Sequence, residues 1–193
     1  DQLPTGARVI ECGSGNHQWI LLIKAYRPDL DIWGLDHCDQ SLKLAETYGI
    51  NYIHCDARQI KLADSSFDLV YSWGLIEHMH ETDLMLREQI RVSKKFISFD
   101  VPYKYSLPII RLARHNKRTG VSAEQAMLRD GKFFSKTQFK DLLDRQRQYF
   151  NISYKIRNNY IVLPSRFDFV DRYLPDVLRS KMGHNIGALD TKS

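Results

Sequence analysis

Residues 9–17, with the sequence Val9-Ile10-Glu11-Cys12-Gly13-Ser14-Gly15-Asn16-His17, decide the fold class of this chain. A short apolar run reaches an acidic residue and then breaks into two glycines that one residue separates. Apolar residues at helical spacing follow at once, between residues 19 and 26. The order strand, glycine turn, helix lets a backbone approach a nucleotide-like ligand without interference from Cβ atoms. Two glycines are a weak signal alone, so the interpretation depends on the rest of the chain.

The composition is that of one ordinary globular domain. The 193 residues are 43% hydrophobic and 26% charged, which suits a single core that folds without cross-links. No apolar run approaches the roughly 20 residues that a membrane-spanning helix needs. Three cysteines, far apart in the sequence, do not predict a disulfide framework and favour a reduced, cytoplasmic setting. The first strand begins close to Asp1, which suggests that preceding residues of a longer protein are missing.

Charge is distributed unevenly along the chain. Residues 1–100 contain 10 Lys or Arg and 15 Asp or Glu, whereas residues 101–160 contain 13 and 4. The basic excess therefore follows the half that contains the glycine turn. It is either a solvated surface or a face that meets an anionic substrate, RNA or an acidic membrane.

Strands and helices alternate through the first half of the chain. Strands are predicted at 30–35, 50–54, 67–72 and 95–101, and helices at 41–48 and 81–92. This alternation predicts a parallel sheet that helices cover on both faces, with ligands beyond the carboxyl ends of the strands. The glycine turn, Asp36, Asp56 and residues 72–78 all follow predicted strand ends, so we expect them to converge on one site.

The second half of the chain is less regular. Residues 103–134 are predicted to form a lid or insert, with a short helix at 121–128. Another helix is expected to begin near Ser135, followed by two β-like runs, 149–156 and 160–163, that an Asn-Asn turn separates. From residue 166 apolar residues again have helical spacing, and the chain from residue 183 is expected to be frayed.

Together these motifs resemble the class I S-adenosylmethionine-dependent methyltransferases. The resemblance rests on the glycine turn, Asp36, Cys55-Asp56-Ala57 and the segment Phe67-Asp68-Leu69-Val70-Tyr71-Ser72-Trp73-Gly74-Leu75-Ile76-Glu77-His78. It covers about residues 6–102 well. It implies an α/β, Rossmann-like, doubly wound and mostly parallel seven-stranded sheet, with an antiparallel last strand in a closing hairpin at 149–163.

The resemblance implies roles for the glycine turn. Gly13 and Gly15 would let the backbone pass against the methionine part of S-adenosylmethionine, and Glu11 would help to order the turn. The family's third glycine falls at His17, which would touch or crowd the carboxylate arm of the cofactor.

The same resemblance assigns the nucleoside part of the cofactor. Asp36, with His37 beside it, would accept hydrogen bonds from the two ribose hydroxyls, because an ionised carboxylate has acceptor sites for both. Asp56 and the backbone of Ala57 would lie at the adenine edge.

The segment after the fourth strand would face the reacting atoms. Ser72 and Trp73 would lie near the sulfonium and its amino-acid arm. His78 is the candidate general base, because an imidazole exchanges protons near neutral pH. Relatives that bind a metal have a Glu three residues before the Glu-His pair, where this chain has Gly74. No metal site is therefore predicted.

The sequence predicts one methyltransferase domain across residues 1–193. It comprises a cofactor-binding half at 1–102, the lid at 103–134, a closing helix and hairpin at 135–165 and a C-terminal helix and tail at 166–193. The expected reaction moves a methyl group to an oxygen or nitrogen of a small molecule, and the oligomeric state is left open. Three alternatives remain: a nucleic-acid methyltransferase that uses the basic 103–157 region, a nicotinamide-dependent dehydrogenase, and a non-catalytic cofactor-binding protein.

Overall fold

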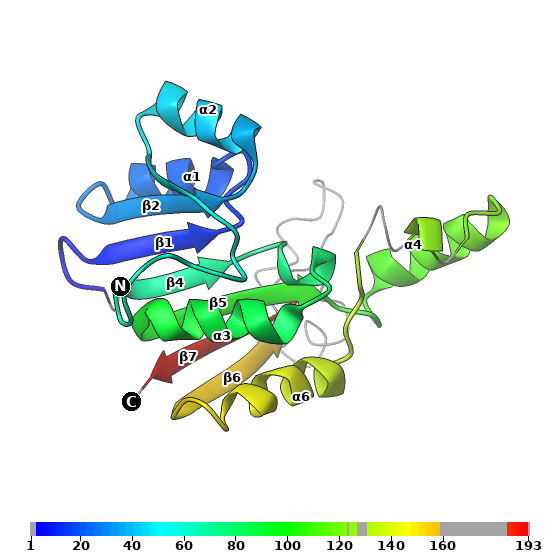
Figure 1. Cartoon of the computed structure of the whole chain (residues 1–193). Coiled ribbons are helices and arrows are strands. Elements are labelled where there is room, and N and C mark those ends of the chain that lie inside the picture. Colours follow the sequence, from blue (N-terminus) through cyan, green and yellow to red (C-terminus); the bar gives the residue numbers. More distant parts are fainter. Residues whose placement is uncertain (1–2, 123, 127–130, 159–184, 193) are drawn as a thin grey trace.

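The structure, a computed structural model, describes residues 3–122, 124–126, 131–158 and 185–192. Its described strands form one sheet in the order β3-β2-β1-β4-β5-β7-β6 (Figure 1). Five of them are parallel: β1 (Arg8–Cys12), β2 (Asp31–Asp36), β3 (Asn51–His54), β4 (Phe67–Ser72) and β5 (Ser93–Pro102). The prediction of an α/β fold with a parallel sheet is confirmed. The chain order reverses at β1 and β4, which is where ligands bind in such sheets.

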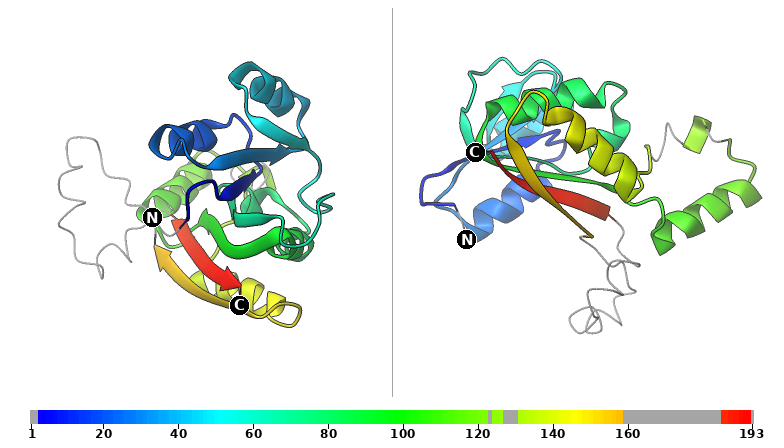
Figure 2. Two further views of the ribbon diagram at one scale, coloured as in Figure 1. Left: turned by 90° about the vertical axis from the view of Figure 1, so that its left-hand side faces the viewer. Right: turned by 90° about the horizontal axis from the view of Figure 1, so that it is seen from below.

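Helices cover both faces of the sheet, as its apolar strands require (Figure 2). On one face α1 (Gln18–Tyr26) and α2 (Asp39–Tyr48) contribute Ile20 and Ala45 to an apolar cluster with β1 and β2. On the other, α3 (Thr82–Val92) and α6 (Lys136–Gln146) pack a second cluster, which includes Met85, Leu86 and Phe139. Helix α6 begins after Ser135, as predicted, because Ser135 and Gln138 form a reciprocal capping box.

The far edge of the sheet differs from the predicted hairpin. Strand β6 is Ile152–Asn158, and its antiparallel partner β7 is Asn185–Lys192, which also pairs antiparallel with β5. The expected partner run at 160–163 lies outside the described residues, and the expectation of a frayed chain from residue 183 is wrong. Residues 185–192 were hard to recognise because Asn185, Gly187 and Ala188 have low strand propensity.

The segment after β5 forms a helix, α4 (Leu107–Arg118), which Ser106 caps by accepting from the backbone N–H of Ile109. Of the helix predicted at 121–128, residues 124–126 are helical, and 123 and 127–130 lie outside the described residues. The predicted C-terminal helix from residue 166 also lies outside them. In the described residues, no helix is long and apolar enough to cross a membrane.

Candidate functional site

The glycine turn after β1 has the backbone that its sequence predicts. Gly13 and Gly15 have φ angles of 76° and 47°, in the left-handed region that glycine adopts readily. The N–H groups of Gly13 and Ser14 donate to the carbonyl oxygen of Leu35, at 2.8 and 3.1 Å. A Cβ atom on Gly13 would lie 2.9 Å from the side chain of Leu75. Position 13 therefore favours glycine for its backbone conformation, and any larger residue would also displace the Leu75 side chain.

Asp36, at the end of β2, faces this turn. Its Oδ2 accepts from the N–H of Gly15 at 2.9 Å, and its Oδ1 accepts from the N–H of Cys38 at 3.1 Å. A carboxylate offers about four acceptor sites. The Nδ1 atom of His37 also lies 3.5 Å from Oδ1. One acceptor site therefore remains on Oδ2, and the remaining site on Oδ1 faces His37.

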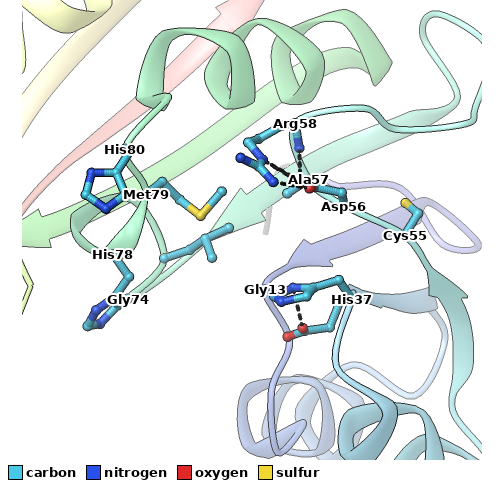
Figure 3. Close-up of a pocket in the computed structure, with 12 residues that line it drawn as sticks. Gly13, His37, Cys55, Asp56, Ala57, Arg58, Gly74, His78, Met79 and His80 are labelled. Atoms are coloured by element: carbon cyan, nitrogen blue, oxygen red, sulfur yellow. Dashed lines mark hydrogen bonds and ion pairs between the residues drawn. The ribbon is translucent and has the colours of Figure 1, made fainter. Parts of the chain in front are cut away.

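A cavity of about 420 Å³ opens beyond the carboxyl ends of the strands (Figure 3). This volume is within the range of small-molecule sites. One side consists of residues that follow β1, β2 and β3: Gly13, Asp36, His37, Cys55, Asp56, Ala57 and Arg58. The other side comes from the turn after β4, which contains the short 3₁₀ helix η1 (Ile76–His78): Gly74, Leu75, His78, Met79 and His80.

The acceptor sites of the Asp56 carboxylate are filled by Arg58, an arginine that the motif did not identify. Both carboxylate oxygens of Asp56 accept from the guanidinium of Arg58, at 2.6 to 3.0 Å, and Oδ1 also accepts from the backbone N–H of Arg58. The same guanidinium donates to Glu81 at 2.6 Å. The hydrogen bonds from Arg58 lower the pKa of Asp56, which keeps the carboxylate ionised.

Glu11 lies beneath the cavity and not in its wall. It is only 2% exposed, and Tyr71 donates to its Oε2 at 3.3 Å. Burial raises the pKa of Glu11 to about 8, although the Tyr71 hydrogen bond opposes the shift. Glu11 is therefore a neutral acid at pH 7 that Tyr71 holds by a hydrogen bond, and its role in ordering the turn stays a prediction.

A second buried carboxyl group lies beneath the opposite wall. Glu77 is 7% exposed, and burial, followed by the charge of Asp100, raises its pKa to about 7. Asp100 accepts from the N–H of Gly74 at 3.0 Å, which fixes the start of the turn after β4. The backbone of Glu77 also accepts from the N–H of Lys132.

Most of the predicted site residues lie together at the cavity, and three of the predicted side chains lie outside its lining. Gly13, Asp36, His37, Asp56, Ala57 and His78 line the cavity, and Gly15 bonds to Asp36. The side chains of His17, Ser72 and Trp73 do not line it. Ser72 is fully buried, and Trp73 packs against Trp19 and Tyr71 while its indole N–H donates to Ser98.

His17 stands where the family has its third glycine, but its side chain does not enter the cavity. Its φ of 62° is the left-handed conformation that glycine favours, and the residue caps α1. The imidazole turns away from the cavity, where its Nε2 lies 2.8 Å from the carbonyl oxygen of Ser41 and its ring meets Tyr52 edge to face. The expectation that His17 touches or crowds the cofactor arm is thus corrected for its side chain.

The motif includes Cys55, Gly74 and Leu75 without assigning them a site role, and it does not include the lining residues Arg58, Met79 and His80. In the described ranges, no group of three or more His, Cys, Asp or Glu side chains could hold a metal ion.

Part of the chain matches a known protein family. Residues 10–96 match the family model described as a methyltransferase domain, and this segment contains every residue that lines the cavity. The match favours a methyltransferase over the dehydrogenase alternative.

Solved structures of methyltransferases share the fold. A Thermotoga maritima enzyme described as a possible histamine N-methyltransferase is 20% identical with a TM-score of 0.71, covering 100% of this chain and 84% of its own. A Mesorhizobium loti S-adenosylmethionine-dependent methyltransferase is 16% identical with a TM-score of 0.68, covering 98% and 94%. The plantazolicin methyltransferase BpumL, bound to S-adenosylhomocysteine, is 16% identical with a TM-score of 0.66, covering 98% and 78%. No curated protein matches the sequence.

Proposed function

We propose that this protein is an S-adenosylmethionine-dependent methyltransferase, which transfers a methyl group to an oxygen or nitrogen atom of a small-molecule acceptor. The observation that carries the proposal is the cavity of about 420 Å³, which has side chains suited to a nucleoside on one wall and the exposed His78 on the other. Similarity to the possible histamine N-methyltransferase is consistent with an acceptor of this size.

The chain's own residues fit the cofactor. The acceptor sites that the backbone N–H groups leave on Asp36 suit the ribose hydroxyls once His37 turns away from Oδ1, and Asp56 with Ala57 suits the adenine edge. Gly13 lines the cavity, and its backbone without a side chain suits a close approach of the methionine part. Bound S-adenosylmethionine supplies an electrophilic methyl group, so the protein needs only to position the acceptor and remove its proton.

His78 is the proposed proton acceptor. It ends η1 and lines the cavity on the wall opposite Asp56, where an acceptor nucleophile would approach (Figure 3). An imidazole suits this role because it exchanges protons near neutral pH.

The test is a product screen with radiolabelled S-adenosylmethionine over small amines, phenols and alcohols, followed by mass spectrometry of labelled products. We expect transfer to at least one compound, and His78→Ala to lower kcat by about 100-fold while the Kd for S-adenosylhomocysteine stays within about 3-fold. Binding of S-adenosylhomocysteine without transfer to any compound would contradict the proposed acceptor class. An equal kcat in His78→Ala would reject His78 as the base.

Arg58 is expected to compete with adenine for Asp56. Each oxygen of Asp56 already accepts two hydrogen bonds, so an exocyclic amine must displace one of them, and Glu81 is positioned to retain the released guanidinium. We therefore expect Arg58→Gln to tighten S-adenosylhomocysteine binding by about 3- to 10-fold, and Glu81→Gln to weaken it, in titration calorimetry.

The analogue S-inosylhomocysteine, which lacks the exocyclic amine, is the matched ligand control. Arg58→Gln should increase the preference for the adenine ligand over this analogue. Weaker binding of both ligands to Arg58→Gln would instead mean that Arg58 holds Asp56 in place.

A further inference from the structure

Helix α4 carries charge of one sign on one face. Arg111, Arg114, His115 and Arg118 are all exposed and are spaced at i, i+3, i+4 and i+7, so they share a face of the helix. We call these four residues the α4 basic face. The opposite side contains Ile109 and Asn116, which are buried, and α4 has no acidic residue.

The arginines of this face differ from most others in the protein. Six described arginines each pair with a carboxylate: Arg8, Arg27, Arg58, Arg91, Arg145 and Arg147. A seventh, Arg87, lies 3.7 Å from the ring centroid of Tyr149. Among the residues that the structure describes, no carboxylate or ring pairs with Arg111, Arg114 or Arg118. Like charges this close on one helix destabilise it by a few tenths of a kcal/mol per pair, about as much as an opposite pair stabilises it. A bound polyanion would remove this repulsion.

The place of α4 relates this face to the active site. The helix follows β5 and extends beyond the carboxyl ends of the parallel strands, on the same side of the sheet as the cavity (Figures 1 and 2). The Cα atoms of Arg111 and Arg118 are about 10 Å apart along the axis, at about 1.5 Å per residue. A single small anion contacts only part of such a row, whereas an extended chain of phosphates follows it.

The surroundings favour a nucleic acid over a bilayer. A helix that lies in a membrane interface exposes an apolar face, but Ile109 is only 5% exposed, and Ile110 and Leu112 are half-buried. At the start of α4, Tyr105 is 54% exposed and its ring packs edge to face on Tyr103. The Nζ atom of Lys104 lies 5.9 Å from the centroid of the Tyr105 ring. Exposed aromatic rings and a row of cations on one segment are the features with which proteins bind single-stranded nucleic acids, by stacking and by phosphate contacts.

We propose that the α4 basic face binds the phosphodiester backbone of single-stranded RNA, with Tyr105 as a platform for one base. This surface is separate from the residues that line the cavity. It goes beyond the proposed methyl transfer, and its failure would leave the cofactor and small-molecule assignments unaffected.

The test uses the full chain and a fluorescein-labelled 15-nucleotide uridine-rich RNA, with anisotropy titrations between 50 and 200 mM KCl. The variant Arg111→Gln/Arg114→Gln/Arg118→Gln should bind at least about 10-fold more weakly at 100 mM KCl. It should also lower the slope of log K against log salt by about 2, because each lost phosphate contact removes about 0.7 for single strands. Tyr105→Ala should weaken binding without changing the slope.

The matched control is Lys24→Gln/Lys43→Gln/Lys61→Gln, which removes three exposed charges from the cofactor-binding half. Its RNA affinity should fall by less than about 3-fold, and both triple variants should bind S-adenosylhomocysteine as the wild type does, which also shows that they fold. If both triple variants lost RNA affinity equally, the cause would be net charge and not the α4 basic face, which would overturn the proposal. So would the absence of RNA binding at 50 mM KCl, or a preference for vesicles with 30% phosphatidylserine over RNA.

Discussion

Replacement of Asp36 by alanine is expected to weaken S-adenosylhomocysteine binding by about 100-fold, measured by titration calorimetry. The proposed ribose contacts are two hydrogen bonds to a charged acceptor, each worth about 1.5–3 kcal/mol, and a tenfold loss corresponds to about 1.4 kcal/mol. The variant also loses the acceptors for the N–H groups of Gly15 and Cys38, so the turn itself loosens.

Two further variants separate the ribose contact from damage to the turn. Asp36→Asn keeps one acceptor oxygen for the N–H of Gly15 and should lose only about 10-fold. Asp39→Ala removes a carboxylate that is 85% exposed on α2 and should change the affinity by less than about 2-fold. A cofactor analogue without the ribose 2′-hydroxyl should show a smaller difference in affinity between wild type and Asp36→Asn than S-adenosylhomocysteine does. If Asp36→Ala bound S-adenosylhomocysteine within about 3-fold of wild type, Asp36 would not be the ribose ligand.

The sequence predicts Asp36 and Asp56 well because their positions follow from strand ends alone. The carboxyl ends of parallel strands meet at one edge, so a short polar residue directly after a strand lies near the cavity whatever its side-chain rotamer. The same logic predicts the general position of His78. It requires no knowledge of which elements pack together.

Side-chain direction and ion pairs were not predictable in this way. His17 follows the glycine turn in sequence, but its left-handed backbone turns the imidazole toward Ser41 on α2. Arg58 joins Asp56 to Glu81, which are 25 positions apart, and only the packing of α3 against the sheet brings them together. Both depend on tertiary contacts that one sequence does not specify.

The closing strand illustrates a different limit. Strand β7 pairs antiparallel with residues 96–102 of β5, which are far from β7 in the sequence. Its residues have weak strand propensity, and the pairing follows from the open edge of β5. Propensity alone therefore placed the partner strand at the more apolar run near residue 160.

Glu11→Gln is expected to stabilise the protein more strongly as the pH rises. The unfolded chain has a glutamic acid pKa of 4.5, whereas that of buried Glu11 is about 8. Between these values the folded protein holds a proton that the unfolded chain has lost. The stability that this proton contributes is fully present below pH 4.5 and falls by at most about 1.4 kcal/mol per pH unit until pH reaches about 8. Glutamine is neutral throughout and still accepts the hydrogen bond from Tyr71, so it escapes this loss.

Urea unfolding of wild type and Glu11→Gln between pH 5 and 8.5 measures the effect as a growing difference in unfolding free energy. Glu77 shifts in the same direction, to a pKa of about 7, but contributes equally to both proteins and cancels in the difference. The exposed Glu46→Gln is the control and should show no such slope. A difference that stays flat would mean that Glu11 is ionised in the folded protein. An ionised Glu11 would need a cationic partner, and within the described residues no Lys, Arg or His forms an ion pair with it, so the buried proton is the state that this geometry supports.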